Sequence, residues 1–213
     1  MIKVLVADDH AIVRRGLKEI LEDEEDMELC AEACDAAELL RILGEIECHI
    51  VVLDITMPGR SGLDVLKDIG NVSPGTQVLV LSMHPEDRYA IRALKGGASG
   101  YITKDSAPEE LVKAIRTITG GGKYISTPLA EELVERLKPG TEVPPHERLS
   151  DREFQVMCMI ASGKMVKEIA EELCLSVKTV STYRMHILDK MNLKSNAEIT
   201  HYAIVNQLVE IDS

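Results

Sequence analysis

The sequence lacks an apolar run long enough to cross a bilayer, and it opens on a strand pattern where a secreted protein would carry a basic and apolar signal peptide. From these two absences we expect a cytoplasmic protein. CxxC pairs are also absent, and the five cysteines have no matching cluster of histidines, so buried free thiols are expected in place of a disulfide or zinc framework. With 213 residues, 45% of them hydrophobic and 28% charged, the chain has the composition of a soluble globular protein.

A phosphate-binding loop of the nucleotide-binding type is missing as well. Three glycines, Gly120 to Gly122, precede Lys123, but the required spacing and the Ser or Thr after the lysine are absent. The run therefore predicts the end of a helix followed by a flexible link.

Negative charge dominates the chain but is unevenly distributed. The net charge is −12, and residues 1–147 hold 16 Lys and Arg against 27 Asp and Glu, whereas residues 148–213 hold 8 against 9. Within the second part, residues 176–194 have four basic side chains and one acidic one, a local charge of +3. The average charge therefore does not exclude nucleic acid as a partner of this segment.

Apolar residues in the first 120 positions alternate between two periods. Short, nearly continuous runs rich in β-branched residues predict strands covered on both faces, at 2–7, 50–53 and 78–81, with weaker runs at 28–33 and 99–102. Helical spacing occurs between them, near 13–21, 36–44, 62–69, 86–95 and 108–118. Five such strand–helix units predict an α/β fold with a five-stranded, doubly wound parallel sheet.

The middle of the chain carries the signals of a domain boundary. Ser106 and Glu109 predict a capping box for the last helix of the first domain, with Pro108 in its first turn. Leucines at 129, 133 and 137 predict a short linker helix, and residues 138–147, rich in proline and polar side chains, predict a tether. We therefore divide the chain into a domain at 1–120, a linker at 121–147 and a domain at 148–213.

The second, smaller domain is predicted to be all α-helical. Ser150 and Glu153 predict another capping box, and Ser162 with Gly163 predicts the end of that helix. A short helix around 169–173, the turn CLS, a helix at 177–191 capped by Ser176 and a helix at 197–205 follow. Two short helices joined by a tight turn, the second with a basic outer side, predict a helix-turn-helix.

Polar residues that are unusual in a buried sheet stand at the predicted strand ends. Asp8 and Asp9 end the first strand, Asp54 the third and Ser82 the fourth, and Lys104 lies just past the fifth. Because the carboxyl ends of parallel strands meet at one edge of a sheet, we expect these side chains to lie together. Three carboxylates form a hard oxygen site suited to Mg²⁺, and the hydroxyl and ammonium are suited to phosphoryl oxygens.

Several motifs resemble a known family. VLVADDH, VVLDITMPGRSG, VLVLSMH and GYITKDSAPEEL are similar to the receiver domain of two-component response regulators, which has a flavodoxin-like fold, and residues 149–209 resemble the LuxR-type helix-turn-helix. Together they match the NarL/FixJ family over nearly the whole chain. The resemblance implies a phosphorylated, DNA-binding transcription regulator with no enzymatic role beyond assisting its own Mg²⁺-dependent aspartyl phosphorylation and dephosphorylation.

The resemblance also assigns roles in the receiver. Asp54 is then the phosphoacceptor, Asp8 and Asp9 position Mg²⁺ together with Asp54 and the backbone carbonyl of Thr56, and Lys104 contacts the phosphoryl group. Ser82 and Tyr101 form the switch, and Pro58 and Gly59 shape the loop beneath the acceptor. The implied partners are a sensor histidine kinase, double-stranded promoter DNA and a second copy of the chain after phosphorylation, with no membrane.

Residues of the third C-terminal helix are the candidate DNA contacts. Lys178, Thr179, Tyr183 and Arg184 are placed to meet phosphates, which fix register without selecting sequence. The resemblance implies that Ser181, Thr182 and Met185 face base edges in the major groove. The chain departs from the common family pattern at Met165 and Val166, where small polar residues are usual, and at Tyr183, where histidine is frequent.

Two alternatives remain beside this interpretation. A Mg²⁺-dependent phosphatase or hydrolase could use the same carboxylates, but it would need a general acid two residues after the nucleophile or a substrate cap, and Thr56 and the short loops offer neither. A regulator whose receiver has lost phosphorylation is the other alternative, and the complete set of five strand-end residues argues against it.

Overall fold

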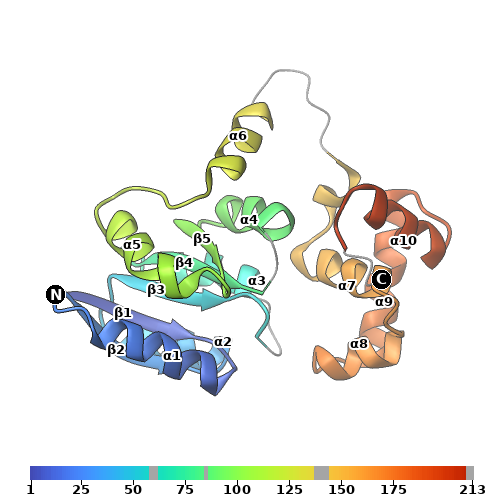
Figure 1. Ribbon diagram of the computed structural model, residues 1–213. Helices are drawn as coiled ribbons and strands as arrows, with labels where there is room; N and C mark the ends of the chain where they lie inside the picture. Colours follow the sequence, from blue (N-terminus) through green and yellow to red (C-terminus); the bar gives the residue numbers. More distant parts are fainter. Residues whose placement is uncertain (58–61, 84–85, 137–143, 210–213) are drawn as a thin grey trace. The chain divides into compact units, whose positions relative to one another are not determined.

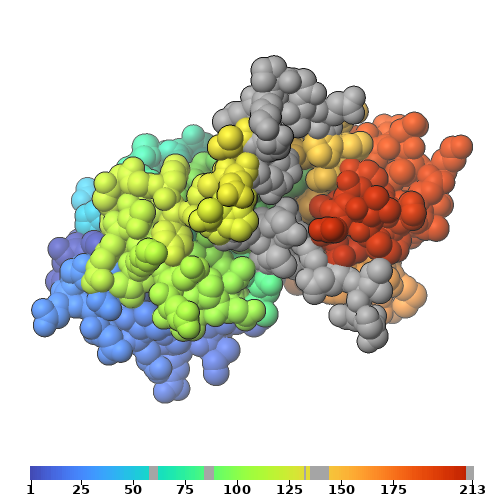
Figure 2. Space-filling model, turned by 45° about the horizontal axis from the view of Figure 1, so that its top comes forward, coloured from blue at the N-terminus to red at the C-terminus, as the bar shows by residue number. Residues whose placement is uncertain are grey.

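The computed structural model describes residues 1–57, 62–83, 86–136 and 144–209, which fall into two units, Met1–Leu137 and Lys138–Ser213. Pro58 and Gly59 lie outside the described residues, as do Leu137 and most of the expected tether. Figure 2 shows one face of the described residues, with the first unit coloured blue to yellow and the second orange to red.

The first unit is built on a parallel five-stranded sheet with the order β2-β1-β3-β4-β5, which confirms the predicted fold class (Figure 1). The strands are β1 (Ile2–Ala7), β2 (Met27–Ala33), β3 (Ile50–Asp54), β4 (Gln77–Ser82) and β5 (Gly100–Thr103). Residues in the central strands β1, β3 and β4 are almost all buried, as their continuous apolar character requires, whereas β2 lies at the edge and exposes Glu28 and Glu32.

Helices cover both faces of this sheet (Figure 1). They are α1 (Ala11–Glu22), α2 (Ala36–Glu45), α3 (Gly62–Val72), α4 (Glu86–Lys95) and α5 (Ala107–Thr119). Leu17 and Leu21 of α1 and Leu111 and Ile115 of α5 form one core layer against the sheet. α2, α3 and α4 pack side by side in chain order. This arrangement brings all five strand ends to one edge, where the loops leave the sheet.

Two local expectations in this unit are corrected. Ser106 does precede α5, but its backbone is already helical and its side chain makes no cap bond, so the expected capping box with Glu109 does not form. The Ser106 hydroxyl instead donates to the carbonyl oxygen of Thr103 at 3.2 Å. All five cysteines are free thiols, as expected. Cys48 is buried, also as expected, whereas Cys34 and Cys174 are exposed.

The segment after α5 extends the first unit. α5 ends at Thr119 with Gly120 as its cap, and Gly121 has φ +89°, which explains the glycine run. Tyr124 then bonds alongside β5, accepting from the Tyr101 N–H at 3.1 Å and donating to the Ser99 carbonyl oxygen at 3.0 Å. α6 (Thr127–Arg136) packs on α4 with Leu129 buried. Residues 121–136 therefore pack on the sheet unit, and α6 lies where the short linker helix was expected.

In the described part of the second unit, four α-helices follow a short 3-10 turn, η1 (Pro145–Arg148). The helices are α7 (Asp151–Ala161), α8 (Val166–Glu172), α9 (Val177–Met191) and α10 (Asn196–Val205). η1 occupies the end of the expected tether, and the His146 Nδ1 lies 2.9 Å from the Tyr202 hydroxyl, so this turn packs on the helices. The capping box of Ser150 with Glu153 and the cap of Ser176 are confirmed. Among the described residues, no helix combines the length and apolar character needed to span a membrane.

Candidate functional site

Four side chains that can bind a cation meet where β1 and β3 end. Ligand atoms of Asp8, Asp9, His10 and Asp54 all lie within 4.8 Å of one another. Asp8 and Asp54 are fully buried, whereas Asp9 is partly exposed at the rim. Carboxylates this close repel one another unless a positive charge lies among them. The residues present therefore fit a divalent cation with oxygen ligands, such as Mg²⁺.

Lys104 supplies one positive charge to this cluster. Its Nζ lies 2.7 Å from Oδ2 of Asp54 and 2.7 Å from Oδ2 of Asp8. Burial alone would lower the pKa of the Lys104 ammonium, but the hydrogen bonds to Asp54 and Asp8 outweigh it and hold the pKa above its ordinary value. The lysine is therefore a permanent cation beside the Asp54 carboxylate.

Thr56 fixes the other oxygen of Asp54. The Thr56 N–H donates to Oδ1 of Asp54 at 2.9 Å, and the Thr56 hydroxyl donates to the same atom at 2.8 Å. The expected role of the Thr56 carbonyl as a metal ligand stays a prediction. With Lys104 on Oδ2, the Asp54 carboxylate has a single orientation.

The switch residues expected from the sequence are both deeply buried. Ser82 is the last residue of β4, and its carbonyl oxygen accepts from the Lys104 N–H at 2.8 Å. Tyr101 is fully buried on β5 and is the largest fully buried side chain described. The structure thus places Ser82 beside the backbone of Lys104 and Tyr101 in the interior behind it.

Three residues that the sequence did not single out also shape the site. Arg14 donates to the Asp8 carbonyl oxygen at 2.7 Å and pairs with Glu32, so α1 and β2 together hold the strand end. His10 Nδ1 lies 2.9 Å from Oδ1 of Asp9. A Cβ on Gly62 would lie 2.5 Å from the Asp54 carbonyl oxygen, so only glycine lets α3 approach β3 this closely. His10 could have been found from its place after the paired aspartates, and Gly62 from its place at the end of the motif VVLDITMPGRSG.

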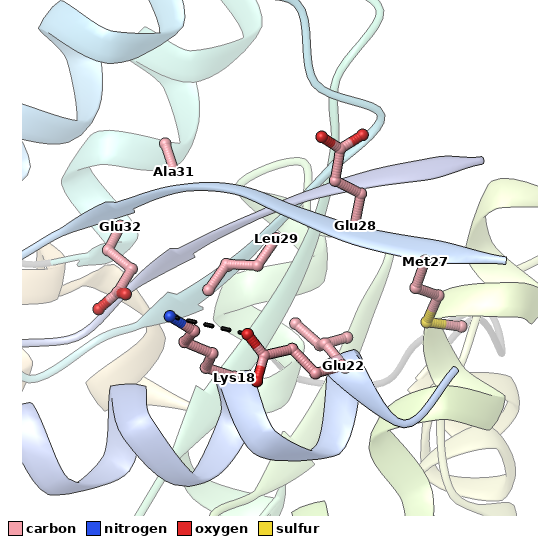
Figure 3. Close-up of a pocket in the computed structure, with 8 residues that line it drawn as sticks. Lys18, Glu22, Met27, Glu28, Leu29, Ala31 and Glu32 are labelled. Atoms are coloured by element: carbon pink, nitrogen blue, oxygen red, sulfur yellow. Dashed lines mark ion pairs between the residues drawn. The ribbon is translucent and has the colours of Figure 1, made fainter. Parts of the chain in front are cut away.

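A groove near the edge strand is separate from this site. Figure 3 shows it between α1 and β2, with the Lys18–Glu22 ion pair of 3.7 Å on one wall and Leu29 and Glu32 on the other, while Glu28 points away from α1. Its volume is about 450 Å³. The mixed charges of its lining are those of a solvated surface groove.

The candidate DNA contacts divide among different sides of α9. Lys178, Thr182 and Met185 follow one another at helical spacing and share the side opposite the buried Val180, Ile187 and Met191, with Ser181 at its margin. We call Lys178, Ser181, Thr182 and Met185 the outer face. Thr179 and Tyr183 lie together on another side, and both are half-buried. The seven candidates thus occupy more than one side of α9, and their contacts with DNA stay a prediction.

Side-chain contacts with α7 and α10 hold α9 in place. The Arg184 Nε donates to Oδ1 of Asn196 at the start of α10. The Lys190 Nζ lies 2.6 Å from Oε2 of Glu153 on α7, and the Glu153 side chain is only 4% exposed. Burial would raise the pKa of the Glu153 carboxyl, but bonds from Lys190 and Ser150 hold it below its ordinary value.

The departures at Met165 and Val166 have a structural counterpart at the start of α8. Met165 is the residue before the helix, and its side chain makes no cap bond and is 65% exposed. Glu168 compensates in part, because its carboxylate accepts from the Met165 N–H at 2.7 Å. The helix start therefore lacks the side-chain hydroxyl that a Ser or Thr would provide.

Comparisons with known families agree with this arrangement. Residues 4–116 match the model of the response regulator receiver domain. Residues 147–203 match the model of bacterial regulatory proteins of the luxR family. The first match contains the whole carboxylate cluster and Lys104, and the second contains α7 to α9.

Individual relatives match over the full length. The chain is 39% identical over 216 residues to the oxygen regulatory protein NreC of Staphylococcus epidermidis, covering 98% of this chain and 99% of NreC. It is 35% identical over 214 residues to the response regulator UvrY of Escherichia coli, covering 100% and 98%. A solved structure of RcsB from Salmonella enterica serovar Typhimurium, bound to promoter rprA with the phosphomimetic BeF3−, has a TM-score of 0.65 and 27% identity, covering 94% and 97%.

Proposed function

The chain belongs to the NarL/FixJ family of response regulators, which join a receiver to a luxR-type DNA-binding domain, and from this premise we propose that Asp54 is its phosphoacceptor. It is a transcription regulator of a two-component system. The observation that supports Asp54 most directly is its position, fully buried, within 2.7 Å of Lys104 and within one cluster with Asp8 and Asp9.

The proposed reaction is transfer of a phosphoryl group from a histidine kinase or a small phosphodonor to Asp54. A carboxylate oxygen forms the new O–P bond while the bond from phosphorus to the leaving group breaks, and the leaving group keeps the electron pair. Bound Mg²⁺, held by Asp8, Asp9, Asp54 and the Thr56 carbonyl, would offset the charge of the incoming phosphoryl oxygens. Lys104 contributes a second positive charge, and Thr56 keeps the acceptor oriented.

Intact mass measurement tests this proposal. The wild-type protein with a small phosphodonor and Mg²⁺ should gain one phosphoryl group, and Asp54→Asn or addition of a chelator should prevent the gain. Asp105→Asn is the matched control, because Asp105 is exposed and lies one residue beyond Lys104. Undiminished labelling of Asp54→Asn would exclude this acceptor.

The proposed output is sequence-specific binding of promoter DNA by α9, with a second copy of the chain bound beside it. A single helix with a local charge of +3 makes few phosphate contacts, so tight binding requires two copies on paired half-sites. We expect phosphorylation at Asp54 to act through Ser82 and Tyr101 on α4, β5 and α5, and so to change self-association or the availability of α9.

Sedimentation and DNA binding should be compared for the unmodified protein, for the protein loaded with beryllofluoride, and for Ser82→Ala. Beryllofluoride should raise both self-association and affinity for operator DNA, and Ser82→Ala should weaken this coupling. Because coupling is reciprocal, operator DNA should also favour the loaded form. If bound beryllofluoride changes neither quantity, the receiver does not regulate this output.

A further inference from the structure

Hydroxyl protons on the outer face of α9 are used within the helix itself. The Ser181 hydroxyl donates to the Val177 carbonyl oxygen at 2.8 Å, and the Thr182 hydroxyl donates to the Lys178 carbonyl oxygen at 3.0 Å. A hydroxyl has one proton and two lone pairs. Toward a ligand, both side chains therefore present acceptor oxygens, and Thr182 adds a methyl group.

The neighbours of these hydroxyls add apolar surface. Met185 is 58% exposed and lies one turn beyond Thr182, and Val177 is 51% exposed at the start of the helix. A thioether is at most a weak acceptor. Asp189 comes next on this side and is exposed, so its negative charge opposes phosphates and limits insertion of α9 to the turns before it.

We propose that this outer face selects A·T base pairs at the centre of each half-site, an inference that rests on the DNA-binding function proposed above. In the major groove thymine presents its C5-methyl group and adenine its N6 amino donor, whereas guanine presents only the acceptors N7 and O6. The Thr182 methyl and Met185 thioether match the thymine methyl. The acceptor oxygens of Ser181 and Thr182 match the adenine amino group.

Guanine and its pair with cytosine fit this face poorly. Recognition of guanine requires a hydrogen-bond donor, and the protons of Ser181 and Thr182 are already used. Cytosine offers an amino donor as adenine does, and each base pair shows two acceptors in the groove, so the discrimination against G·C rests on the thymine methyl group, which neither guanine nor cytosine has.

Lys178 also belongs to the outer face and, unlike its neighbours there, can donate hydrogen bonds to guanine. Its ammonium is exposed and has three donors. It stands in the first turn of α9, where backbone N–H groups already favour a phosphate, so we assign it to the DNA backbone. If it contacted guanine instead, guanine would be the selected base.

The test uses the full chain loaded with beryllofluoride and duplexes with randomised sequence. Selection should recover A·T pairs at the centre of the half-site. In the selected duplex, each thymine is then replaced singly by deoxyuridine, which removes only the C5-methyl group. Loss of one buried methyl contact should weaken binding about fourfold at one or two central positions.

Variants assign each contact. Thr182→Ser keeps the hydroxyl and removes the methyl group, so at its position it should bind the thymine and uracil duplexes equally. Met185→Leu, the apolar control, should keep the A·T preference, whereas Met185→Arg supplies only donors and should shift selection toward guanine. Each variant is first compared with the wild type on a random duplex, so that a folding defect is recognised as loss of all binding.

Two results would overturn the inference while leaving DNA binding intact. One is selection of guanine at the central positions that disappears in Lys178→Ala. The other is equal affinity for thymine and uracil duplexes at every position. Binding without sequence preference, or no binding at all, would instead contradict the proposed function itself.

Discussion

The Lys104 ammonium lies 2.7 Å from Oδ2 of Asp54 and equally close to Oδ2 of Asp8, so one cation bridges two fully buried carboxylates. Asp9 adds a third negative charge at the rim of the same cluster. The arrangement is stable only while positive charge stays among these oxygens. Lys104 and a divalent cation are therefore expected to act together on the stability of the receiver as well as on its chemistry.

Lys104→Met should destabilise the protein at neutral pH. Removing one partner of a buried ion pair leaves the other charge uncompensated and costs about 3–5 kcal/mol. Mg²⁺ should restore part of this loss, because it binds only the folded state. Urea unfolding with and without Mg²⁺ measures both effects. Lys123→Met is the control, because the Lys123 ammonium contacts the Ala98 carbonyl oxygen and, among the described residues, pairs with no carboxylate. A loss for Lys104→Met that Mg²⁺ leaves unchanged would contradict the assignment.

Gly62→Ala should lower stability and slow phosphorylation together. The added Cβ would lie 2.5 Å from the Asp54 carbonyl oxygen and 2.7 Å from Cα of Ile55, so the backbone of the acceptor must move. Overpacking of this kind costs roughly 1–3 kcal/mol. Gly70→Ala in the same helix is the matched control, since its Cβ would meet nothing within 4 Å, and it should stabilise by about 0.5–1 kcal/mol. Equal behaviour of the two variants would show that the close approach has no consequence.

Glu153→Gln should destabilise the second unit at neutral pH and not at acid pH. The folded-state pKa of Glu153 lies below its ordinary value of 4.5, so its carboxylate stabilises above that pH and the contribution is lost as the pH falls through the folded value. A buried hydrogen bond to a charged group is worth about 1.5–3 kcal/mol. Phe154, the single phenylalanine, is buried in this unit, and its ring signals report unfolding. Glu171→Gln, in an exposed pair with Lys167, should change little.

Lys178→Ala should weaken binding to specific and random duplexes alike. Removing one phosphate contact reduces the slope of log affinity against log salt by about 1. Titrations of both duplexes at several salt concentrations measure this slope. Lys18→Ala on the first unit, where Lys18 pairs with Glu22, is the control and should leave the slope unchanged. An effect of Lys178→Ala on one sequence alone would assign this side chain to a base.

Much of the fold could be predicted because the local signals are strong. β1 and α9 have the predicted bounds, since a continuous apolar run marks the strand and the Ser176 cap marks the helix start. The capping box at Ser106 was wrong because it depends on a backbone angle that the residue types do not determine. η1 was missed because its stability comes from contacts of His146 with Tyr202, which lies 56 residues away.

Part of the candidate site could likewise be predicted from the sequence, and part could not. That Asp8, Asp54 and Lys104 would meet followed from the parallel sheet, because strand ends share an edge. That one ammonium contacts both carboxylates, and that Gly62 must lack a side chain, depend on distances between segments far apart in the chain. On α9, the resemblance implied that Ser181, Thr182 and Met185 face bases, but the internal use of the Ser181 and Thr182 protons depends on distances within the folded helix.

The edge strand β2 limits the ways in which copies of this protein can associate. An open strand edge can pair with a strand of another chain, and repeated pairing of this kind would extend one sheet through many copies. β2 exposes Glu28 and Glu32, and Arg14 compensates only the second. Two such edges brought together would align like charges across the new strand pair, which is unfavourable. This edge of the sheet is therefore protected against strand pairing with a second copy.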